Sequence, residues 1–164
     1  MNIIYDFFHN HLLWTALAAF LIAQTIKFFI NWAVDKRPHI TRLFGDGGMP
    51  SGHSATVSAL AAMTGYTTGF DRPLFAIAMV LAIIVMHDAK GVRREAGKQA
   101  TSILLLFETL NKLLTTKDKI EQEEKLKTLV GHSPLQVFFG ALLGIAVAAL
   151  YVVIFGVEPL CYAA

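Results

Sequence analysis

The 164-residue sequence has few charged residues and almost no cysteine. Asp, Glu, Lys and Arg make up only 16% of it, whereas 55% is hydrophobic and the mean hydropathy is +0.54. These values are too apolar for an ordinary soluble domain and predict an integral membrane protein. The single cysteine, Cys161, excludes an internal disulfide and any metal site built from cysteines.

The sequence also lacks features that would divide or process the chain. It has no internal repeat and no low-complexity tract, and its length suits one compact domain. The first residues contain neither a basic segment nor a small-residue cleavage site, so we expect no removable signal peptide. We therefore expect one membrane-embedded domain over residues 1–164.

Four segments have the composition of membrane helices. Residues 12–34 and 134–155 are long enough to span, because a bilayer core needs about 20 residues at ~1.5 Å each. Residues 74–87 are short for a span, but the helix has room to continue through 88–97. Residues 51–69 are rich in Ser, Ala, Thr and Gly, which suits burial between helices better than exposure to lipid. The prediction is an all-α helical membrane bundle with about four transmembrane helices.

Residues 101–131 have a different pattern. Their apolar residues fall at helical spacing with polar residues among them, namely Ile103, Leu106, Phe107, Leu110, Leu113 and Leu114. This predicts an amphipathic helix, either at the membrane surface or against the bundle. The charged run KDKIEQEEKLK that follows is best interpreted as a solvated helical face.

The stretch GDGGMPSGHSATVSAL, residues 45–60, combines glycines, a proline, serines and a histidine. Pro50 disfavours helix at Met49, so a helix is expected to begin near Ser51. The first turn of a helix has unpaired N–H groups and a positive dipole end, which bind phosphate-like anions. Ser51 and Ser54 would add hydroxyl groups, and His53 a group that transfers protons near neutral pH. The stretch alone is equally consistent with a plain N-cap at Ser51 and a His53 without a role.

Other polar residues favour the anion site. Lys27 and Asp88 lie at or near membrane depth, where ionisable groups are costly and usually functional. His132 lies just before the last predicted span, which begins at residue 134. In an up-down bundle all these residues share one membrane face with a basic cluster, Lys90, Arg93, Arg94 and Lys98. Taken together they favour a phosphate site over ordinary charged flanks or a snorkelling Lys27.

Three motifs in this order, GGMPSGHSATVSAL, DAKGVRREAGKQA and GHSPLQVFFGALLG, resemble the divergent branch of the type 2 phosphatidic acid phosphatase superfamily. That branch is related to acid phosphatases and vanadium-dependent haloperoxidases. The superfamily's Pro-Ser-Gly-His motif is matched directly by residues 50–53. The other two motifs are altered. Lys27 is followed by Arg37-Pro38 after nine residues instead of six, and Arg42 competes with Arg37. Gln136 stands where the superfamily has an aspartate after the histidine matched by His132.

The resemblance implies a phosphatase-like domain that acts on a lipid phosphate in the membrane. It implies that His132 attacks phosphorus, that His53 protonates the leaving group and later acts as base, and that Asp88 orients a catalytic group. Phosphate oxygens would be held by six residues: Lys27, Arg42, Ser51, Gly52, Arg93 and Arg94, with Arg93 or Arg94 replacing an arginine that the superfamily places upstream of the nucleophile. The scheme needs no cofactor and no metal ion, and no nucleic-acid partner is expected.

Two alternatives stay open at this point. With Gln136 in place of the aspartate, the chain fits a non-catalytic phospholipid-binding or transport-assisting protein that has kept the anion pocket. A vanadate-dependent oxidation fits less well, because a membrane bundle suits amphipathic substrates better than soluble peroxide chemistry. The sequence also leaves a homo-oligomer open.

The placement of positive charge predicts the orientation in the plasma or inner membrane. Of the 14 Lys and Arg residues, three lie in residues 35–50 and nine in residues 90–131. Lys27 lies within the first span, and only Arg72 lies on the opposite side. By the positive-inside rule the active site faces the cytoplasm and both termini lie outside.

Overall fold

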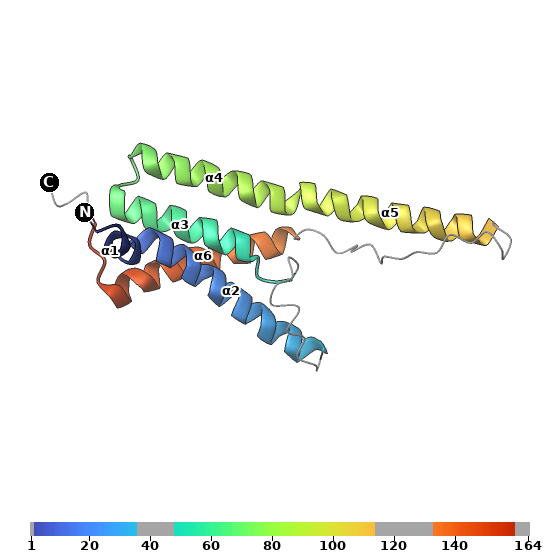
Figure 1. Cartoon of the computed structure of the whole chain (residues 1–164), viewed down its shortest axis with the longest axis horizontal. Coiled ribbons are helices and arrows are strands. Elements are labelled where there is room, and N and C mark those ends of the chain that lie inside the picture. Colours follow the sequence, from blue (N-terminus) through green and yellow to red (C-terminus); the bar gives the residue numbers. More distant parts are fainter. Residues whose placement is uncertain (1, 36–47, 114–132, 160–164) are drawn as a thin grey trace.

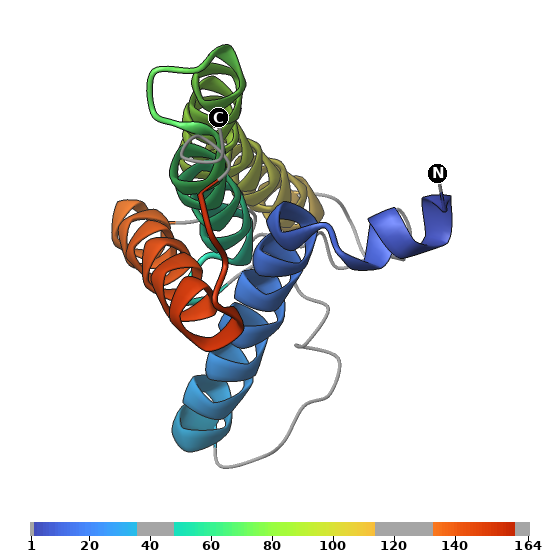
Figure 2. The same ribbon diagram turned by 90° about the vertical axis from the view of Figure 1, so that its left-hand side faces the viewer.

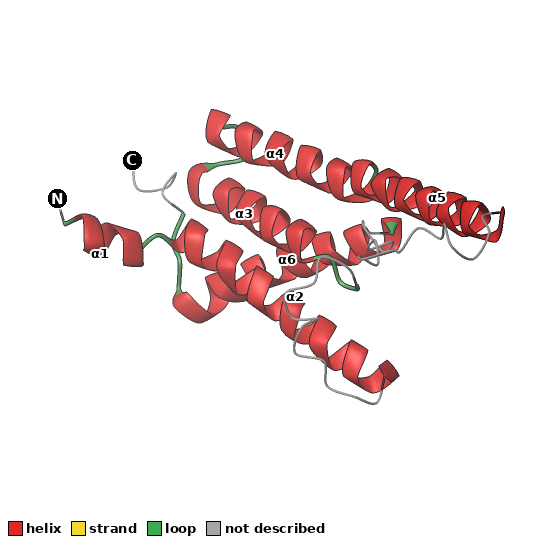
Figure 3. Cartoon of the chain, turned by 45° about the vertical axis from the view of Figure 1, so that its right-hand side comes forward, coloured by secondary structure: helices red, strands yellow, loops and turns green. Residues whose placement is uncertain are grey.

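The computed structural model describes residues 2–35, 48–113 and 133–159, and these ranges contain helices and no strand (Figures 1 and 3). The helices are α1 (Ile3–Phe8), α2 (His11–Asp35), α3 (Gly52–Thr68), α4 (Pro73–Lys90), α5 (Val92–Leu113) and α6 (Pro134–Phe155). The predicted all-α class is confirmed.

Helix α3 is the central element of the bundle. It packs against α2, α4 and α6, which lie on different sides of it (Figure 2). By length and composition, three helices can cross a membrane: α2 over His11–Ala33, α4 and α6. Helix α3 is shorter and less apolar, and most of its residues are buried. The predicted burial of this small-residue segment between helices is confirmed, so the bundle has three apolar outer helices around a more polar central one.

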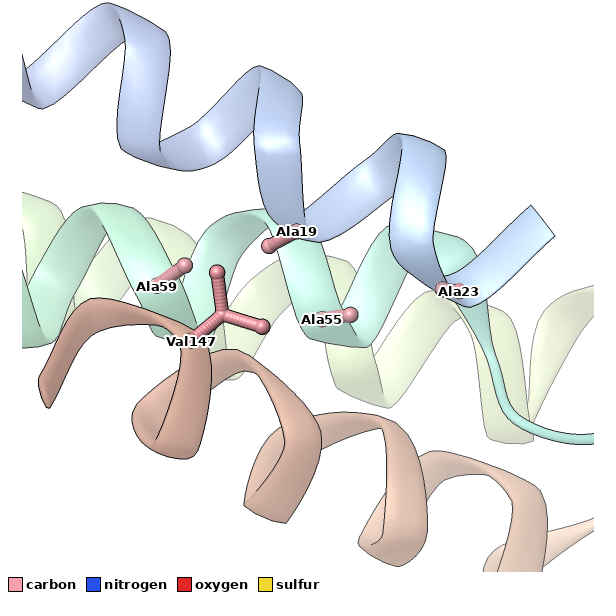
Figure 4. Close-up of a cluster of buried hydrophobic side chains, with 5 residues drawn as sticks. All are labelled: Ala19, Ala23, Ala55, Ala59 and Val147. Atoms are coloured by element: carbon pink, nitrogen blue, oxygen red, sulfur yellow. The ribbon is translucent and has the colours of Figure 1, made fainter. Parts of the chain in front are cut away.

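Small residues allow these helices to approach closely. One core cluster consists of Ala19, Ala23, Ala55, Ala59 and Val147 from α2, α3 and α6 (Figure 4). Large apolar side chains instead point outward, where lipid would surround them. Without a hydrophobic force between helices in lipid, such close backbone packing is a main source of stability.

Gly144 shows how tight this packing is. A Cβ atom added there would meet the Ala55 carbonyl oxygen and lie 2.9 Å from the Ala59 backbone nitrogen. We therefore expect Gly144→Ala to lower the free energy of unfolding by about 1–3 kcal/mol, as overpacking usually does. An SDS titration of the purified protein measures this. Ala146→Val on the exposed side of α6 is the matched control. Equal unfolding midpoints for Gly144→Ala and the wild type would contradict the close α3–α6 contact.

Helix α5 continues from α4 away from the bundle (Figure 1). The third apolar segment was expected to extend through residues 88–97. This extension is confirmed as far as Lys90, where α4 ends, and only Gly91 separates α4 from α5. The amphipathic helix begins at residue 92 and not near 101 as expected. Among the described helices α5 contacts only α4. Of the two locations expected for the amphipathic helix, packing against the bundle is therefore not found in the described part of α5. The charged run at 117–127 lies outside the described residues.

The helix directions bring the polar segments together. The C-terminal ends of α2 and α4 and the N-terminal ends of α3 and α6 lie at one end of the bundle, which we call the polar end (Figure 1). This arrangement confirms the up-down order expected from the sequence.

Candidate functional site

The first turn of α3 is fixed to α6 by Ser51. Its hydroxyl oxygen accepts hydrogen bonds from the Ser54 N–H (3.4 Å) and the Ser54 hydroxyl (3.0 Å). Its own N–H donates to the Gln136 carbonyl oxygen at 3.0 Å. Ser51 and Ser54 have no exposed surface. Ser51 is thus the N-cap of α3, one of the two interpretations that the sequence left open, and its contact with phosphate stays a prediction.

Gln136 has a structural role at the start of α6. Its side-chain Oε1 accepts a hydrogen bond from the Ser133 N–H (2.9 Å), while its N–H donates to the Ser133 hydroxyl oxygen (3.3 Å). This reciprocal pair is a capping box. The sequence already contained the signal for a capping box, Ser-x-x-Gln before an apolar run. The comparison with the superfamily motif had treated Gln136 only as the replacement of an aspartate.

Lys27 is the most unusual residue of the polar end. It lies on a membrane-spanning helix and is only 3% exposed. Its side chain packs against the segment leading into α3, because a Cβ atom added at Gly48 would lie 3.2 Å from the Lys27 Cγ. Gly48 has a φ of +102°, which favours glycine at this position of close approach. A buried lysine differs from the snorkelling lysine that was the alternative interpretation.

Gln24, one turn before Lys27 on α2, lies beside the start of α3. It was not among the site residues predicted from the sequence. A Cβ atom added at Gly52 would lie 4.0 Å from the Gln24 Cδ and 3.4 Å from the Phe20 ring. The Gln24 Oε1 is buried and has no hydrogen-bond donor in the part of the chain that the structure describes. The spacing of three between Gln24 and Lys27, which puts both on one side of a helix, was the available signal.

His53 and Asp88 lie at the polar end on neighbouring helices. His53 is in the first turn of α3 and is partly exposed. Helix α4 runs antiparallel to α3, with the Ser58 hydroxyl 3.9 Å from the Met86 sulfur, so Asp88 lies near the level of the first turns of α3. The role of Asp88 in orienting a catalytic group stays a prediction.

For the remaining predicted site residues, the structure describes the backbone alone, or the residues lie outside the described ranges. Arg93 and Arg94 belong to the first turn of α5, directly after Gly91, and only their backbone is described. His132 and Arg42 lie outside the described residues. The structure therefore places Lys27 against Gly48, in the segment that leads to Ser51 and Gly52, with His53 and Asp88 at the same end of the bundle.

The electrostatics of this end favour an anion. The Gly52 and His53 N–H groups stand in the first turn of α3, where no intrahelical acceptor exists, and the positive end of the helix dipole lies there. The Lys27 ammonium group is carried on the adjacent helix and is buried. Within the described ranges no three His, Cys, Asp or Glu side chains gather into a group that could hold a metal ion.

Comparison with known proteins agrees with these features. The model of the divergent PAP2 family matches residues 8–147. The chain belongs to the divergent PAP2 family. A relative from Bacillus subtilis (strain 168), described as "Uncharacterized membrane protein YuiD", is 43% identical over 142 residues, which cover 83% of this chain and 90% of the relative. No solved structure matches the chain.

The family match confirms the resemblance found in the motifs. Its range includes every predicted site residue, from Lys27 on α2 to His132 before α6. The relative's description and the three apolar helices both support a membrane protein. Neither of them assigns an activity.

Proposed function

We propose that this divergent PAP2 family member is a membrane-embedded, metal-independent phosphatase of lipid phosphates. The observation that carries the proposal is Lys27, a lysine buried within a membrane helix beside the segment leading into the α3 N-terminus. A cation and a helix N-terminus together complement the charge that builds on the equatorial oxygens of a phosphoryl group during transfer. His53 in the same first turn supplies a proton donor.

The proposed mechanism has two steps. His132 attacks phosphorus and the bond to the leaving oxygen breaks, which gives a phosphohistidine, while His53 protonates the leaving group. A water molecule then loses a proton to His53 and attacks the phosphohistidine, which releases phosphate and restores both histidines. Lys27, the Gly52 N–H and the arginines Arg42, Arg93 and Arg94 neutralise the phosphoryl oxygens, and Asp88 orients a histidine.

A second candidate function is favoured by Gln136. A carboxylate that orients a catalytic imidazole also stabilises the imidazolium form, and a neutral amide does so less. The Gln136 Oε1 accepts the Ser133 N–H, so this side chain serves the helix start. This observation supports a phospholipid-binding or transport-assisting protein without turnover.

Phosphate release from purified protein separates the two candidates. We expect release from dioctanoyl phosphatidate, or from another member of a panel of lipid phosphates and pyrophosphates, in the presence of EDTA and with inhibition by vanadate. His53→Ala should lower the rate, and His9→Ala at the other end of the bundle is the matched control. Lipid phosphate binding without release from any panel member would instead establish the second candidate.

We also propose that the polar end faces the cytoplasm, as the positive-inside rule predicts from the charges. In a Cys161→Ala background, an exposed cysteine is introduced at Asp71, in the α3–α4 turn, or at Ser102 on α5. We expect a membrane-impermeant maleimide to label Asp71→Cys in intact cells and Ser102→Cys only after permeabilisation. The reverse pattern would show that the site faces outward.

A further inference from the structure

One side of α3 has no neighbour among the helices that the structure describes. Helix α3 contacts α2, α4 and α6, but among the described helices α2 and α4 do not contact each other (Figure 2). Four partly exposed residues, His53, Thr56, Val57 and Leu60, follow one another at helical spacing along α3. We call them the uncovered stripe. The residues between them, Ser54, Ala55, Ser58 and Ala59, are buried by α2, α4 and α6.

The uncovered stripe is open only over the half of α3 nearest the polar end. The next residues on the same side, Met63, Thr64 and Thr67, are at most 3% exposed. The open part therefore spans eight residues, from His53 to Leu60, which is about 10 Å along a helix.

The polarity of the uncovered stripe changes along its length. It begins at His53, in the first turn of α3, at the end of the bundle that holds buried Lys27. The Thr56 hydroxyl donates to the Gly52 carbonyl oxygen at 2.8 Å, so its hydrogen-bonding need is met within the helix. Val57, at the edge of the stripe where it packs against the cluster of Ala61, Ala78 and Ala82 between α3 and α4, and Leu60 complete it with apolar side chains. An anionic head at the His53 end and a hydrocarbon tail toward Leu60 match this order of charge and polarity.

We propose that the uncovered stripe receives the hydrocarbon tail of a lipid phosphate that enters from the bilayer between α2 and α4. The proposal rests on the proposed phosphate site, because the head group must lie at the α3 N-terminus for its tail to follow Thr56, Val57 and Leu60. The outer sides of α2 and α4 carry exposed large apolar residues such as Leu21 and Ile84, so the stripe opens toward lipid and not toward water.

Photolabelling tests the proposal independently of turnover. The probe is phosphatidate with a diazirine on one acyl chain, added to the full-length protein in phosphatidylcholine vesicles. We expect the label on α3 at residues 56–60, and a several-fold loss of this label in Leu60→Trp and in Val57→Phe, which fill the stripe. Ile83→Trp, on the exposed side of α4, is the matched control and should label like the wild type. Monodisperse elution of each variant verifies folding.

Three results would overturn the proposal. The first is α3 labelling that neither Leu60→Trp nor Val57→Phe reduces. The second is equal α3 labelling by a diazirine phosphatidylcholine, which would show a nonselective lipid contact. The third is crosslinking of two copies through Leu60→Cys in a Cys161→Ala background, which would show that a second copy covers the stripe.

The outcome also separates this proposal from the proposed hydrolysis. Tail labelling as expected, without phosphate release from any lipid phosphate, supports the uncovered stripe and refutes the phosphatase. Phosphate release with labelling that the two filling variants leave unchanged supports the phosphatase and refutes the stripe.

Discussion

Replacement of His132 by alanine is expected to abolish phosphate release while the protein still binds a phosphate analogue. The proposed nucleophile forms the covalent intermediate, and the scheme gives this role to no other residue. Binding depends instead on Lys27 and the α3 N-terminus, which the substitution leaves in place. Release is measured with dioctanoyl phosphatidate, and binding by the protection that vanadate gives against SDS unfolding.

The matched control for this prediction is His9→Ala, because His9 lies at the opposite end of the bundle and is exposed. Wild-type protein that is quenched during turnover should carry a phosphoryl label, and acid treatment should remove this label. His132→Ala should carry no such label. Near-normal release by His132→Ala would refute the phosphohistidine mechanism, whatever the other variants do.

The sequence predicted the placement of α3 well, because local chemistry and burial agree there. Pro50 and Ser51 fix the helix start by backbone restriction and capping, and the Ser, Ala, Thr and Gly composition requires helical neighbours in a membrane. The grouping of Lys27, His53 and Asp88 at one end followed from the up-down order of the helices alone. These inferences need only the direction of each helix and not its detailed packing.

Features that depend on packing could not be predicted in the same way. The sequence does not show that Gly144 meets the α3 backbone, because the face of α6 that turns inward is set by its neighbours. The uncovered stripe likewise depends on the lack of contact between described parts of α2 and α4. The start of α5 was placed too late because Gly91 and the charges after it resemble a loop, whereas the helix resumes after one residue. Gln136 was considered only as the replacement of an aspartate, although its spacing from Ser133 already allowed a capping box.

Lys27→Met is the second variant with a large expected effect. Loss of one charged donor that acts on developing negative charge typically lowers turnover by about 10²–10³-fold, and we expect a loss of this size in kcat/KM for lipid phosphate. Lys27→Arg should retain part of the activity, because it keeps the charge but changes its position. Arg72→Met, which removes an exposed cation at the opposite end, should have no effect.

Stability measurements distinguish a phosphate-binding lysine from a structural one. Removing one partner of a buried ion pair that mainly serves the fold costs several kcal/mol, about 3–5, because the remaining charge stays buried. If Lys27 mainly binds the substrate, Lys27→Met should have an SDS unfolding midpoint close to that of the wild type. The variant should also lose the protection that vanadate gives against unfolding. A lowered midpoint with unchanged vanadate protection and unchanged KM would assign Lys27 to the fold and remove the observation on which the proposed phosphatase rests.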